Sequence, residues 1–597
     1  MTYILFANSN CIQLFYAPKI PVMILKKTNI LIALSLFAVI KTYCQTLPQY
    51  NFRDPLDIPM YLAGNFGELR TNHFHTGIDI KTESRVGIPI YAVEDGYITR
   101  VKVSGTGYGN ALYIAHPNGY TSVYAHMQKF TKDIDQYVER AQYRDKTFDI
   151  NLFPGPDVFS FKKGDIIGYT GNSGSSGGPH LHFELRETSS EHPVNPLLFG
   201  FNIKDEIKPS IYGIMVYPLT DSSVINGFTT PQNFAMGGSF GNYTLKANNR
   251  IETQGEFGIA VHTIDRLTGF PNKCGVFEIK LLVDSTLIYH QKMDELDFST
   301  NRYINAHMDY GIYKTNRKSY HKCFKLPNNK LDIYEVAINN GRLNLNTGEQ
   351  KDITVLVTDA YGNSSKLRFK VTGKSFINIH QPTIIGHQLM KYNKANDFVG
   401  KEVQFSLPPD ALYEDLKFEY STSPALDNSF SSIHTLHHNN VPIHKYGTLK
   451  IKPSKTIEQH LKNKALIVQL DNQNRPSAEG GNWDGELMVT KTREFGSYTI
   501  MLDTTPPTIQ PLTSIKSRIL GNGSQIVFRI NDDLSGIKTA EAFVGDNWVL
   551  LSYNPKRGKV TYTINKKYIE IGSQPLKVVI TDKVGNIKEY NTKIMVK

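Results

Sequence analysis

Short stretches of alternating apolar and polar residues, separated by turns, dominate the chain. In the first third they predict six strands, over residues 88–93, 97–103, 111–116, 121–126, 166–170 and 180–186. Turn residues such as Asp95-Gly96 separate several of them. The one predicted helix covers residues 132–144 and ends before the Phe-Pro-Gly-Pro break at 153–156. We therefore expect an antiparallel β domain over residues 50–200.

A hairpin pattern occurs twice in the remainder of the chain. Residues 355–363 have the sequence Val-Leu-Val-Thr-Asp-Ala-Tyr-Gly-Asn, and residues 578–586 have Val-Val-Ile-Thr-Asp-Lys-Val-Gly-Asn. Each predicts a buried strand, a Gly-Asn turn and a polar strand, as in a β-sandwich. With the stiff linker Asp-Thr-Thr-Pro-Pro at 503–507, they predict Ig-like β-sandwiches at 207–375 and 504–597. Residues 376–503 are β-rich without the repeat, so the expected fold class is mostly β throughout.

Composition excludes several classes of protein. The chain has 597 residues, which at about 150 per domain suggests about four domains. An aromatic content of 11% excludes a disordered chain, and 45 Gly are too few for a collagen. The net charge of +11 comes without a dense Lys/Arg run, so we expect no nucleic-acid partner, whereas a weak attraction to anionic cell-wall polymer is compatible with it.

The N-terminal segment has the pattern of an export signal. An apolar run over residues 30–40 follows Lys26-Lys27 and is too short to span a bilayer as a helix. Its polar end at 42–45 predicts cleavage near Cys44, with residues 1–22 as an upstream mis-start before Met23. We expect an exported protein in the periplasm, at the outer membrane surface or secreted. Cys44 as a lipid-bearing residue is the alternative, although the residues before it make a poor lipobox.

Two cysteines remain after such a cleavage. Cys274 and Cys323 permit one disulfide in an exported chain. Two buried free thiols are the alternative.

Three histidine motifs carry the candidate chemistry. They are His73-Phe74-His75-Thr76-Gly77-Ile78-Asp79, Tyr124-Ala125-His126 and His180-Leu181-His182-Phe183-Glu184. Positions two apart on a strand share a face, so His180, His182 and Glu184 are expected to point together. Two imidazoles and one carboxylate are a ligand set for catalytic zinc, whereas calcium prefers oxygens throughout. Spacing alone leaves open which histidines bind the metal.

The same motifs resemble the lysostaphin/LytM-type zinc endopeptidase family, in the family's order over residues 65–198. Gly-Ile-Pro-Ile-Tyr-Ala at 87–92, Lys-Gly-Asp-Ile-Ile-Gly at 163–168 and Gly-Asn-Ser-Gly at 171–174 complete the resemblance. It implies a LytM-like antiparallel β-sheet peptidase that binds one Zn²⁺ and cuts peptide bonds in peptidoglycan. The implied zinc ligands are His75, Asp79 and His182, and the implied catalytic pair is His126 and His180. His73 and Glu184 would then support the ligands, with His73 as the rival of His75.

Some features depart from the family or lie outside it. The family usually has a short connection after His126, whereas residues 127–163 form a long one here, either a passive surface insertion or a wall of the substrate groove. A further histidine group lacks nearby carboxylates in the sequence and predicts a solvated loop; its members are His434, His437, His438 and His444. Trp483 and Trp548 are expected in the cores or edges of sandwiches rather than as platforms for sugars.

The sequence therefore favours an exported zinc metallo-endopeptidase that acts on peptidoglycan in wall remodelling or lysis. The β-sandwiches would be spacers or would dock to the wall or envelope. The alternative is a non-catalytic wall-binding regulator or adhesin with a vestigial zinc site. A polysaccharide-active protein lacks the expected carboxylate pair. Because all the motifs lie before residue 185, we expect residues 207–597 to be dispensable for bond cleavage and to meet the peptidase through modest polar interfaces.

Overall fold

The computed structural model of the protein describes residues 51–597, except 247–248, 381–386 and 516–517. The predicted export signal and Cys44 lie outside the described residues. Within the described part, no helix has both the length and the apolar character needed to cross a membrane.

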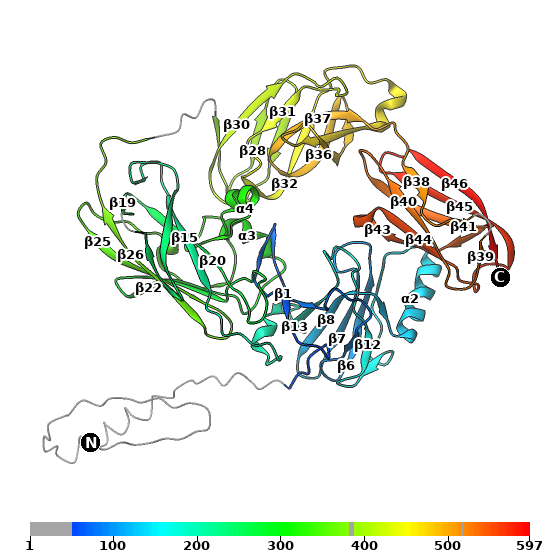
Figure 1. The fold of residues 1–597 in the computed structure, drawn as a ribbon. Coiled ribbons are helices and arrows are strands. Elements are labelled where there is room, and N and C mark those ends of the chain that lie inside the picture. The colour runs from blue at the N-terminus through cyan, green and yellow to red at the C-terminus, as the bar shows by residue number, and fades with distance from the viewer. Residues whose placement is uncertain (1–50, 247–248, 381–386, 516–517) are drawn as a thin grey trace, which may run out of the picture. The chain divides into compact units, whose positions relative to one another are not determined.

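The first domain is built on a nine-stranded antiparallel sheet that matches the predicted strands closely (Figure 1). In spatial order the strands are β1 (Leu62–Gly64), β4 (Ile78–Lys81), β13 (His180–Glu187), β8 (Tyr120–Met127), β7 (Asn110–Ala115), β6 (Gly96–Val103) and β10 (Ile150–Leu152), with β14 (Pro193–Val194) beside β13 and β11 (Ser160–Phe161) beside β6. A second, three-stranded sheet and a hairpin complete the β structure: β5 (Pro89–Tyr91), β12 (Ile166–Tyr169) and β9 (Lys129–Phe130), then β2 (Leu69–Arg70) with β3 (His73–Phe74).

Strand β13 lies between β4 and β8 and determines which side chains meet. In this register His182 is opposite Asp79 on one side and Ala125 on the other. Alternate residues Leu181, Phe183 and Leu185 are fully buried in the apolar core. The face opposite this core therefore carries His180, His182 and Glu184, as the period of two predicts.

The insertion after β8 contains the predicted helix. Helix α2 spans Lys132–Asp145, one residue longer than expected, and ends where Lys146 adopts a left-handed φ of 49°. Ile134, Val138 and Ala141 of its apolar stripe pack on the core of the first domain. The insertion is therefore anchored to the sheet and is not a loose loop.

Residues 210–373 form a twelve-stranded sheet, ten strands of which follow one continuous path, and a large apolar core packs within it. The path is β23 (Tyr320–Lys322), β20 (Phe257–Ile264), β15 (Ser210–Pro218), β17 (Gln232–Ser239), β18 (Asn242–Leu245), β26 (Ser364–Gly373), β25 (Gln350–Thr358), β21 (Glu278–Val283), β22 (Thr286–Lys292) and β24 (Tyr334–Ala337), with β16 (Val224–Ile225) and β19 (Ile251–Gln254) off the path. The short helices are η2 (Pro196–Leu198) before it, then η3 (Asn301–Tyr303), α3 (Ile304–His307), α4 (Tyr310–Asn316) and η4 (Ile338–Gly341). The first predicted hairpin is β25–β26.

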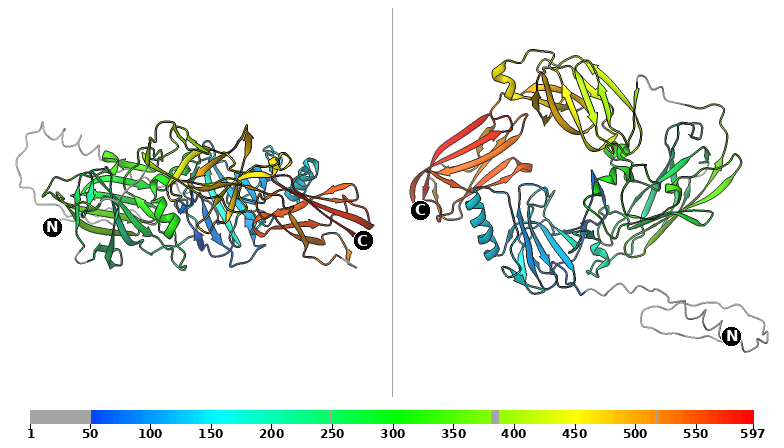
Figure 2. Two further views of the ribbon diagram at one scale, coloured as in Figure 1. Left: turned by 90° about the horizontal axis from the view of Figure 1, so that it is seen from above. Right: turned by 180° about the vertical axis from the view of Figure 1, so that it is seen from behind.

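The next two modules each consist of two sheets around a separate core, visible in the two views of Figure 2. Residues 387–502 contain β27 (His387–Met390), β30 (Leu416–Ser423), β31 (Ile433–Leu436), β37 (Gly496–Leu502), β33 (Ala465–Leu470) and β34 (Pro476–Gly480) in one sheet, and β28 (Asn396–Val399), β29 (Val403–Leu407), β32 (Pro442–Ile451), β36 (Leu487–Glu494) and β35 (Asn482–Asp484) in the other, with η5 (Gln459–Lys464). Residues 508–596 contain β38 (Thr508–Pro511), β40 (Gln525–Asn531), β44 (Lys559–Thr563) and β43 (Leu551–Asn554), opposite β39 (Ile519–Leu520), β46 (Ile587–Val596), β45 (Gly572–Asp582), β41 (Ile537–Val544) and β42 (Asn547–Val549), with η6 (Pro555–Arg557). The second predicted hairpin is β45–β46.

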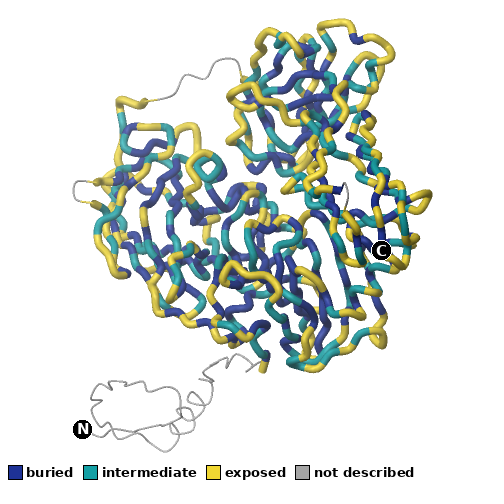
Figure 3. The backbone as a smooth tube through the Cα atoms, turned by 45° about the vertical axis from the view of Figure 1, so that its right-hand side comes forward, coloured by how far each residue is buried: buried dark blue, intermediate teal, exposed yellow. Residues whose placement is uncertain are grey.

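The expectation of modest polar interfaces around the first domain is wrong. Phe66, Leu69 and Phe74 of this domain share one buried apolar cluster with residues of 293–333 and with Tyr413. Figure 3 shows the chain coloured by burial, with many buried residues throughout the described part. The first domain therefore depends on its neighbour for part of its core.

The disulfide permitted by the sequence is not formed. Cys274 and Cys323 are both free and buried. Cys274 packs in the core of the first domain and Cys323 in that of residues 210–373, so each thiol serves a different apolar cluster.

Candidate metal centre and catalytic histidines

Three of the predicted residues converge on one point. The Nε2 atom of His75 lies 3.1 Å from Oδ1 of Asp79 and 3.1 Å from Nδ1 of His182, and the last two atoms are 2.8 Å apart. Their exposed fractions are only 2%, 7% and 4%, so water cannot satisfy these atoms freely. The implied zinc ligands therefore form a single buried cluster.

The hydrogen bonds of the two imidazoles determine which nitrogens can bind a metal. His75 donates from Nδ1 to the carbonyl of Asn65 at 2.7 Å, and His182 donates from Nε2 to Glu184 Oε1 at 2.8 Å. The other nitrogen of His75 then carries a lone pair. Nδ1 of His182 faces Asp79 at 2.8 Å and donates to it while the ring is protonated. A metal ion at this point would take the place of that proton.

The cluster fits a zinc ion. Ligands at 2.0–2.2 Å from a tetrahedral zinc lie about 3.3–3.6 Å from one another. The three atoms are 2.8–3.1 Å apart here, so small side-chain shifts would open the cluster enough to hold the ion. Two neutral imidazoles and a carboxylate are also ligands that zinc accepts and that calcium does not prefer.

Electrostatics in the cluster follow from burial and from the neighbouring carboxylates. Burial lowers the pKa of His75 to about 4. Burial would lower the pKa of His182 as well, but hydrogen bonds to Asp79 and Glu184 outweigh it and raise the pKa to about 9. Burial opposes ionisation of Asp79, yet the surrounding histidines hold the pKa of its carboxyl well below the ordinary value. The pocket thus favours a cation next to an ionised Asp79.

Two further side chains hold the ligands, and sequence reasoning gave a role to only one of them. Arg70 donates to Asp79 Oδ2 at 2.8 Å, which leaves Oδ1 to face the histidines. Glu184 is completely buried and accepts hydrogen bonds from Thr76, Tyr108 and Arg186 besides His182. Glu184 therefore orients His182 and lies away from the open side of the cluster. Arg186 follows Glu184 by two positions on β13, so the same alternation could have predicted that its side chain lies beside Glu184. The sequence around Arg70 has no pattern that predicts its contact with Asp79.

His126 and His180 form a pair next to the cluster. Their ring centroids are 4.8 Å apart, and the His126 ring is 5.8 Å from that of His182. His126 donates from Nδ1 to the carbonyl of Ser173 at 3.0 Å, and His180 donates from Nδ1 to that of Gly178 at 2.8 Å. Nε2 of His126 is left for other chemistry, whereas Nε2 of His180 lies 3.4 Å from Asp79 Oδ1.

The backbone and the environment of His126 are unusual. It adopts a left-handed φ of 61° at the end of β8, a conformation that costs free energy in non-glycine residues and that clusters at functional sites. Burial lowers its pKa to about 3, so the ring is neutral at physiological pH.

The remaining histidines do not join this centre. His73 is exposed, and its Nδ1 hydrogen-bonds the carbonyl of Thr71, so it is no rival to His75 as a ligand. The solvated loop predicted for the 434–444 group is wrong in part, because His434 lies buried in β31 and His437 is also buried. Glu419 from β30 lies within 4.8 Å of His437 and His438. The sequence could not show this carboxylate because it lies on a different strand.

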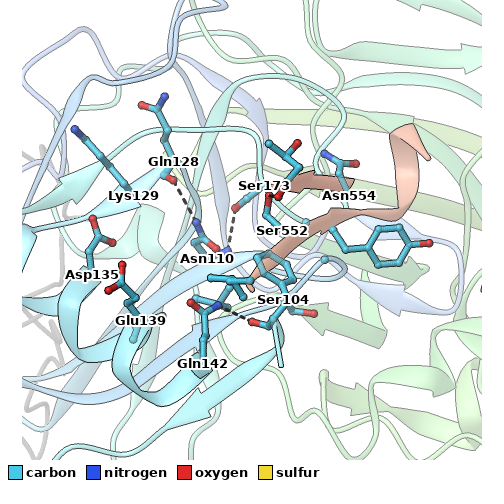
Figure 4. Close-up of a pocket in the computed structure, with 18 of the residues that line it drawn as sticks. Ser104, Asn110, Gln128, Lys129, Asp135, Glu139, Gln142, Ser173, Ser552 and Asn554 are labelled. Atoms are coloured by element: carbon cyan, nitrogen blue, oxygen red, sulfur yellow. Dashed lines mark hydrogen bonds between the residues drawn. The ribbon is translucent and has the colours of Figure 1, made fainter. Parts of the chain in front are cut away.

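A cavity of about 440 Å³ is lined by residues of the first domain and of the last module (Figure 4). Ser173, whose carbonyl accepts from His126, lines it together with Asn110 and Gln128. Helix α2 lines it through Asp135, Val138, Glu139 and Gln142, and the last module through residues such as Ser552 and Asn554. The insertion therefore lines a pocket that Ser173 connects to the candidate centre, while neither His126 nor His180 is among its lining residues.

Contacts between α2 and the last module close this side of the pocket. The rings of Tyr143 and Tyr568 stack with centroids 3.4 Å apart, and Trp548 meets Tyr143 edge-on. Glu139 accepts a hydrogen bond from Asn565 at 3.1 Å. Trp548 is thus a contact residue between modules, while Trp483 is half-buried and donates to the carbonyl of Lys462.

Comparisons with known proteins find matches to the first domain and to one later module. Residues 73–143 match the family model of Peptidase family M23, and residues 387–503 match that of a Zu5-like domain. The DD-carboxypeptidase/endopeptidase Mpg of Neisseria meningitidis serogroup B is 36% identical over 129 residues, which are 22% of this chain and 23% of that protein. The peptidoglycan DD-endopeptidase ShyA of Vibrio cholerae is 28% identical over 139 residues, 22% of this chain and 26% of that protein.

A solved structure is also similar. A mutant form of the catalytic domain of the prophage-encoded M23 protein EnpA from Enterococcus faecalis is 27% identical, with 24% of this chain and 95% of that chain covered and a TM-score of 0.19. The two curated relatives are matched over about a quarter of their own length. The family match includes His75, Asp79 and His126, and residues 73–143 of this protein belong to a Peptidase family M23 domain.

Proposed function

We propose that the protein is an exported zinc metallo-endopeptidase that hydrolyses peptide bonds in peptidoglycan. The observation that carries the proposal is the convergence of His75 Nε2, Asp79 Oδ1 and His182 Nδ1 within 3.1 Å of one another. The neighbouring pair His126 and His180 supplies two further imidazoles, each held by a hydrogen bond from Nδ1 to a backbone carbonyl. The M23 match and relatives named as peptidoglycan endopeptidases support the substrate class.

The three converging residues would hold the zinc ion. When bound, it supplies Lewis acidity, which makes water easier to deprotonate and polarises a carbonyl. Glu184 and the carbonyl of Asn65 keep both histidines in the tautomer that can bind it. Arg70 donates to Oδ2 of Asp79, which favours the ionised carboxylate and leaves Oδ1 facing the two histidines.

The paired histidines would move the protons. His126 is neutral and its Nε2 lone pair is free, so it accepts a proton from the attacking water. His180 Nε2 lies 3.4 Å from Asp79 Oδ1, and this second imidazole would lie beside the developing oxyanion. The proton taken by His126 then passes to the leaving amine.

A peptide cross-link of peptidoglycan would lie along the open side of this pair. The cavity between Ser173 and α2 is adjacent and has mixed polar and apolar walls, which suits a stem peptide with both amide and alkyl groups. We propose that the α2 insertion is a wall of this substrate groove.

The test is hydrolysis of purified peptidoglycan by the mature chain loaded with zinc. The proposal expects new amino groups, loss of activity with a chelator, and recovery when zinc is added back. Defined cross-linked and uncross-linked muropeptides, analysed by mass, identify the bond. A zinc-loaded, folded protein that releases no amine from either substrate would favour a non-catalytic wall-binding protein instead.

A further inference from the structure

Three buried aspartates gather at the start of the 210–373 module, away from the histidines. One carboxylate oxygen from each of Asp205, Asp265 and Asp359 lies within 4.8 Å of the others. Their exposed fractions are 9%, 2% and 3%. Such a group of carboxylates is costly to bury unless a positive charge or protons compensate it.

Two oxygens in this cluster have no partner. Oδ2 of Asp205 and Oδ1 of Asp265 are buried and accept no hydrogen bond from any described residue. The arrangement thus has acceptors in excess and lacks a donor.

The other oxygens are fixed in place. Asp205 Oδ1 accepts from the backbone of Ile207 and Thr268, and Asp359 Oδ1 accepts from the backbone of Tyr361 and Asn363. The Asn363 amide donates both to Asp359 Oδ2 and to the carbonyl of Asp205. The carboxylates are therefore held in position before any ligand arrives.

The size of the cluster fits one hard cation. Oxygens on opposite sides of a calcium ion, at 2.3–2.6 Å each, are about 4.6–5.2 Å apart, so oxygens within 4.8 Å can share one ion. The donors are all oxygens, which favours calcium or magnesium over zinc. Calcium tolerates irregular geometry, whereas magnesium demands a near-ideal octahedron.

The same constellation occurs again in the last module. Asp503, Asp532 and Asp582 also place oxygens within 4.8 Å of one another, and Oδ1 of Asp532 is buried without a partner among the described residues. The Asn586 amide donates to Asp582 Oδ2 and to the carbonyl of Asp503, as Asn363 does in the first cluster.

Three short sequence patterns generate both clusters. Asp205 and Asp503 are each followed by Pro at +4 and Ile at +6. The motif Asp-x-Leu-Ser/Thr-Gly starts at both Asp265 and Asp532. The motif Asp-x-x-Gly-Asn starts at both Asp359 and Asp582. An accidental cluster of acids would not repeat in residue type, spacing and hydrogen bonding.

We propose that Asp205, Asp265 and Asp359 bind one calcium ion and that Asp503, Asp532 and Asp582 bind a second. Each ion joins the linker that enters a module to two loops of that module. Those loops also contact the preceding domain: Leu267 packs on the core of the first domain, and Leu534 and Val584 pack on a cluster of the Zu5-like module. Calcium would therefore stiffen two junctions of the chain.

The experiment is equilibrium dialysis of the full zinc-loaded chain against radioactive calcium in the presence of excess magnesium. The proposal expects two calcium ions per chain. Asp265→Asn and Asp532→Asn should each remove one ion, and the double variant should remove both, while the zinc content stays unchanged. The matched controls Glu206→Gln and Asp533→Asn alter acids beside the clusters that are not among their members and should keep both ions.

A second measurement uses the wild-type chain alone, in case a variant does not fold. Saturating calcium, at 100 times its Kd, should raise the Tm by roughly 5 °C. If the aspartates share protons instead, the wild-type chain will bind no calcium and its Tm will not respond to it. The proposal would be overturned if the wild-type chain binds no calcium or if its Tm does not respond to calcium. It would also be overturned if both Asp→Asn variants still bind two ions.

Discussion

Each histidine of the centre uses one ring nitrogen for an internal hydrogen bond and presents the other. The partners are the carbonyls of Asn65, Ser173 and Gly178 and the carboxylate of Glu184. Fixed partners remove the choice of tautomer, so the ligands and the catalytic pair are prepared without side-chain rearrangement. Metal binding and proton transfer therefore depend on different residues and can be separated by substitution.

Replacing a ligand should differ from replacing a proton carrier. His182→Ala should lose both zinc and activity, because it removes one of three protein ligands. His126→Ala should retain zinc while kcat/KM falls by about 10²–10⁴-fold, the usual contribution of a general base. Zinc content by mass spectrometry and amine release measure the two effects. Loss of zinc from His126→Ala would show that this residue is a ligand.

Glu184 should act through His182. Glu184→Gln leaves the buried Arg186 without its carboxylate and weakens the acceptor for His182, so zinc affinity should fall by about 10–100-fold. Glu187→Gln, an exposed change on the same strand, is the matched control and should bind zinc as the wild type does. Competition with a chromogenic chelator measures the affinity. Equal affinities in the two variants would contradict this role of Glu184.

The sequence predicted much of this centre and missed its supports for a physical reason. Alternation on one strand placed His180, His182 and Glu184 together, and the family resemblance assigned the ligands. The contact of Arg70 with Asp79 and that of Tyr108 with Glu184 join segments whose approach depends on the tertiary fold. No local pattern encodes such contacts.

At the scale of elements, strands and their turns were predictable because each depends on neighbouring residues. The six predicted strands of the first domain and the helix α2 lie within about two residues of their expected positions. The single twelve-stranded sheet of residues 210–373 was not predictable, since the pairing of strands is a long-range property.

A pair of buried histidines in this twelve-stranded module predicts a pH dependence of stability. His307 of α3 and His321 of β23 are hydrogen-bonded at 3.1 Å, and burial lowers the pKa of both, that of His321 to about 3. Below pH 6.5 the unfolded chain binds protons that the folded chain does not. The stability is thus complete above about pH 6.5 and is lost as the pH falls toward 3.

The expected loss at pH 5 is about 2 kcal/mol for His321 alone. Calorimetric Tm values between pH 7.5 and 5 measure it. His321→Gln should weaken the dependence of Tm on pH, whereas the exposed control His460→Gln should leave it unchanged. An identical pH dependence in wild type and His321→Gln would contradict this account.

At the scale of the whole molecule, the first domain is not an independent unit. Phe66, Leu69 and Phe74 complete their core with residues such as Met293 and Phe324. Residues 504–597, by contrast, have a core of their own. Dependence on the neighbouring module could not be foreseen, because apolar residues in a sequence do not reveal which surface covers them.

Truncations should follow these cores. A fragment that ends at residue 200 exposes the apolar cluster and should not fold, whereas a chain that ends at residue 503 should fold, bind zinc and cut soluble muropeptides. Circular dichroism and zinc content distinguish the cases. A folded, zinc-loaded fragment ending at 200 would show that the shared cluster is dispensable, and an inactive but folded chain ending at 503 would show that the last module completes the substrate groove.

The measurement that tests the central claim most directly is mass analysis of defined cross-linked muropeptides after incubation with the zinc-loaded chain and with His126→Ala. The account predicts that the wild-type protein splits the cross-linked substrate by adding one water at a peptide bond, and that the variant, with the same zinc content, leaves it intact. Intact substrate with the folded, zinc-loaded wild-type protein would contradict the claim.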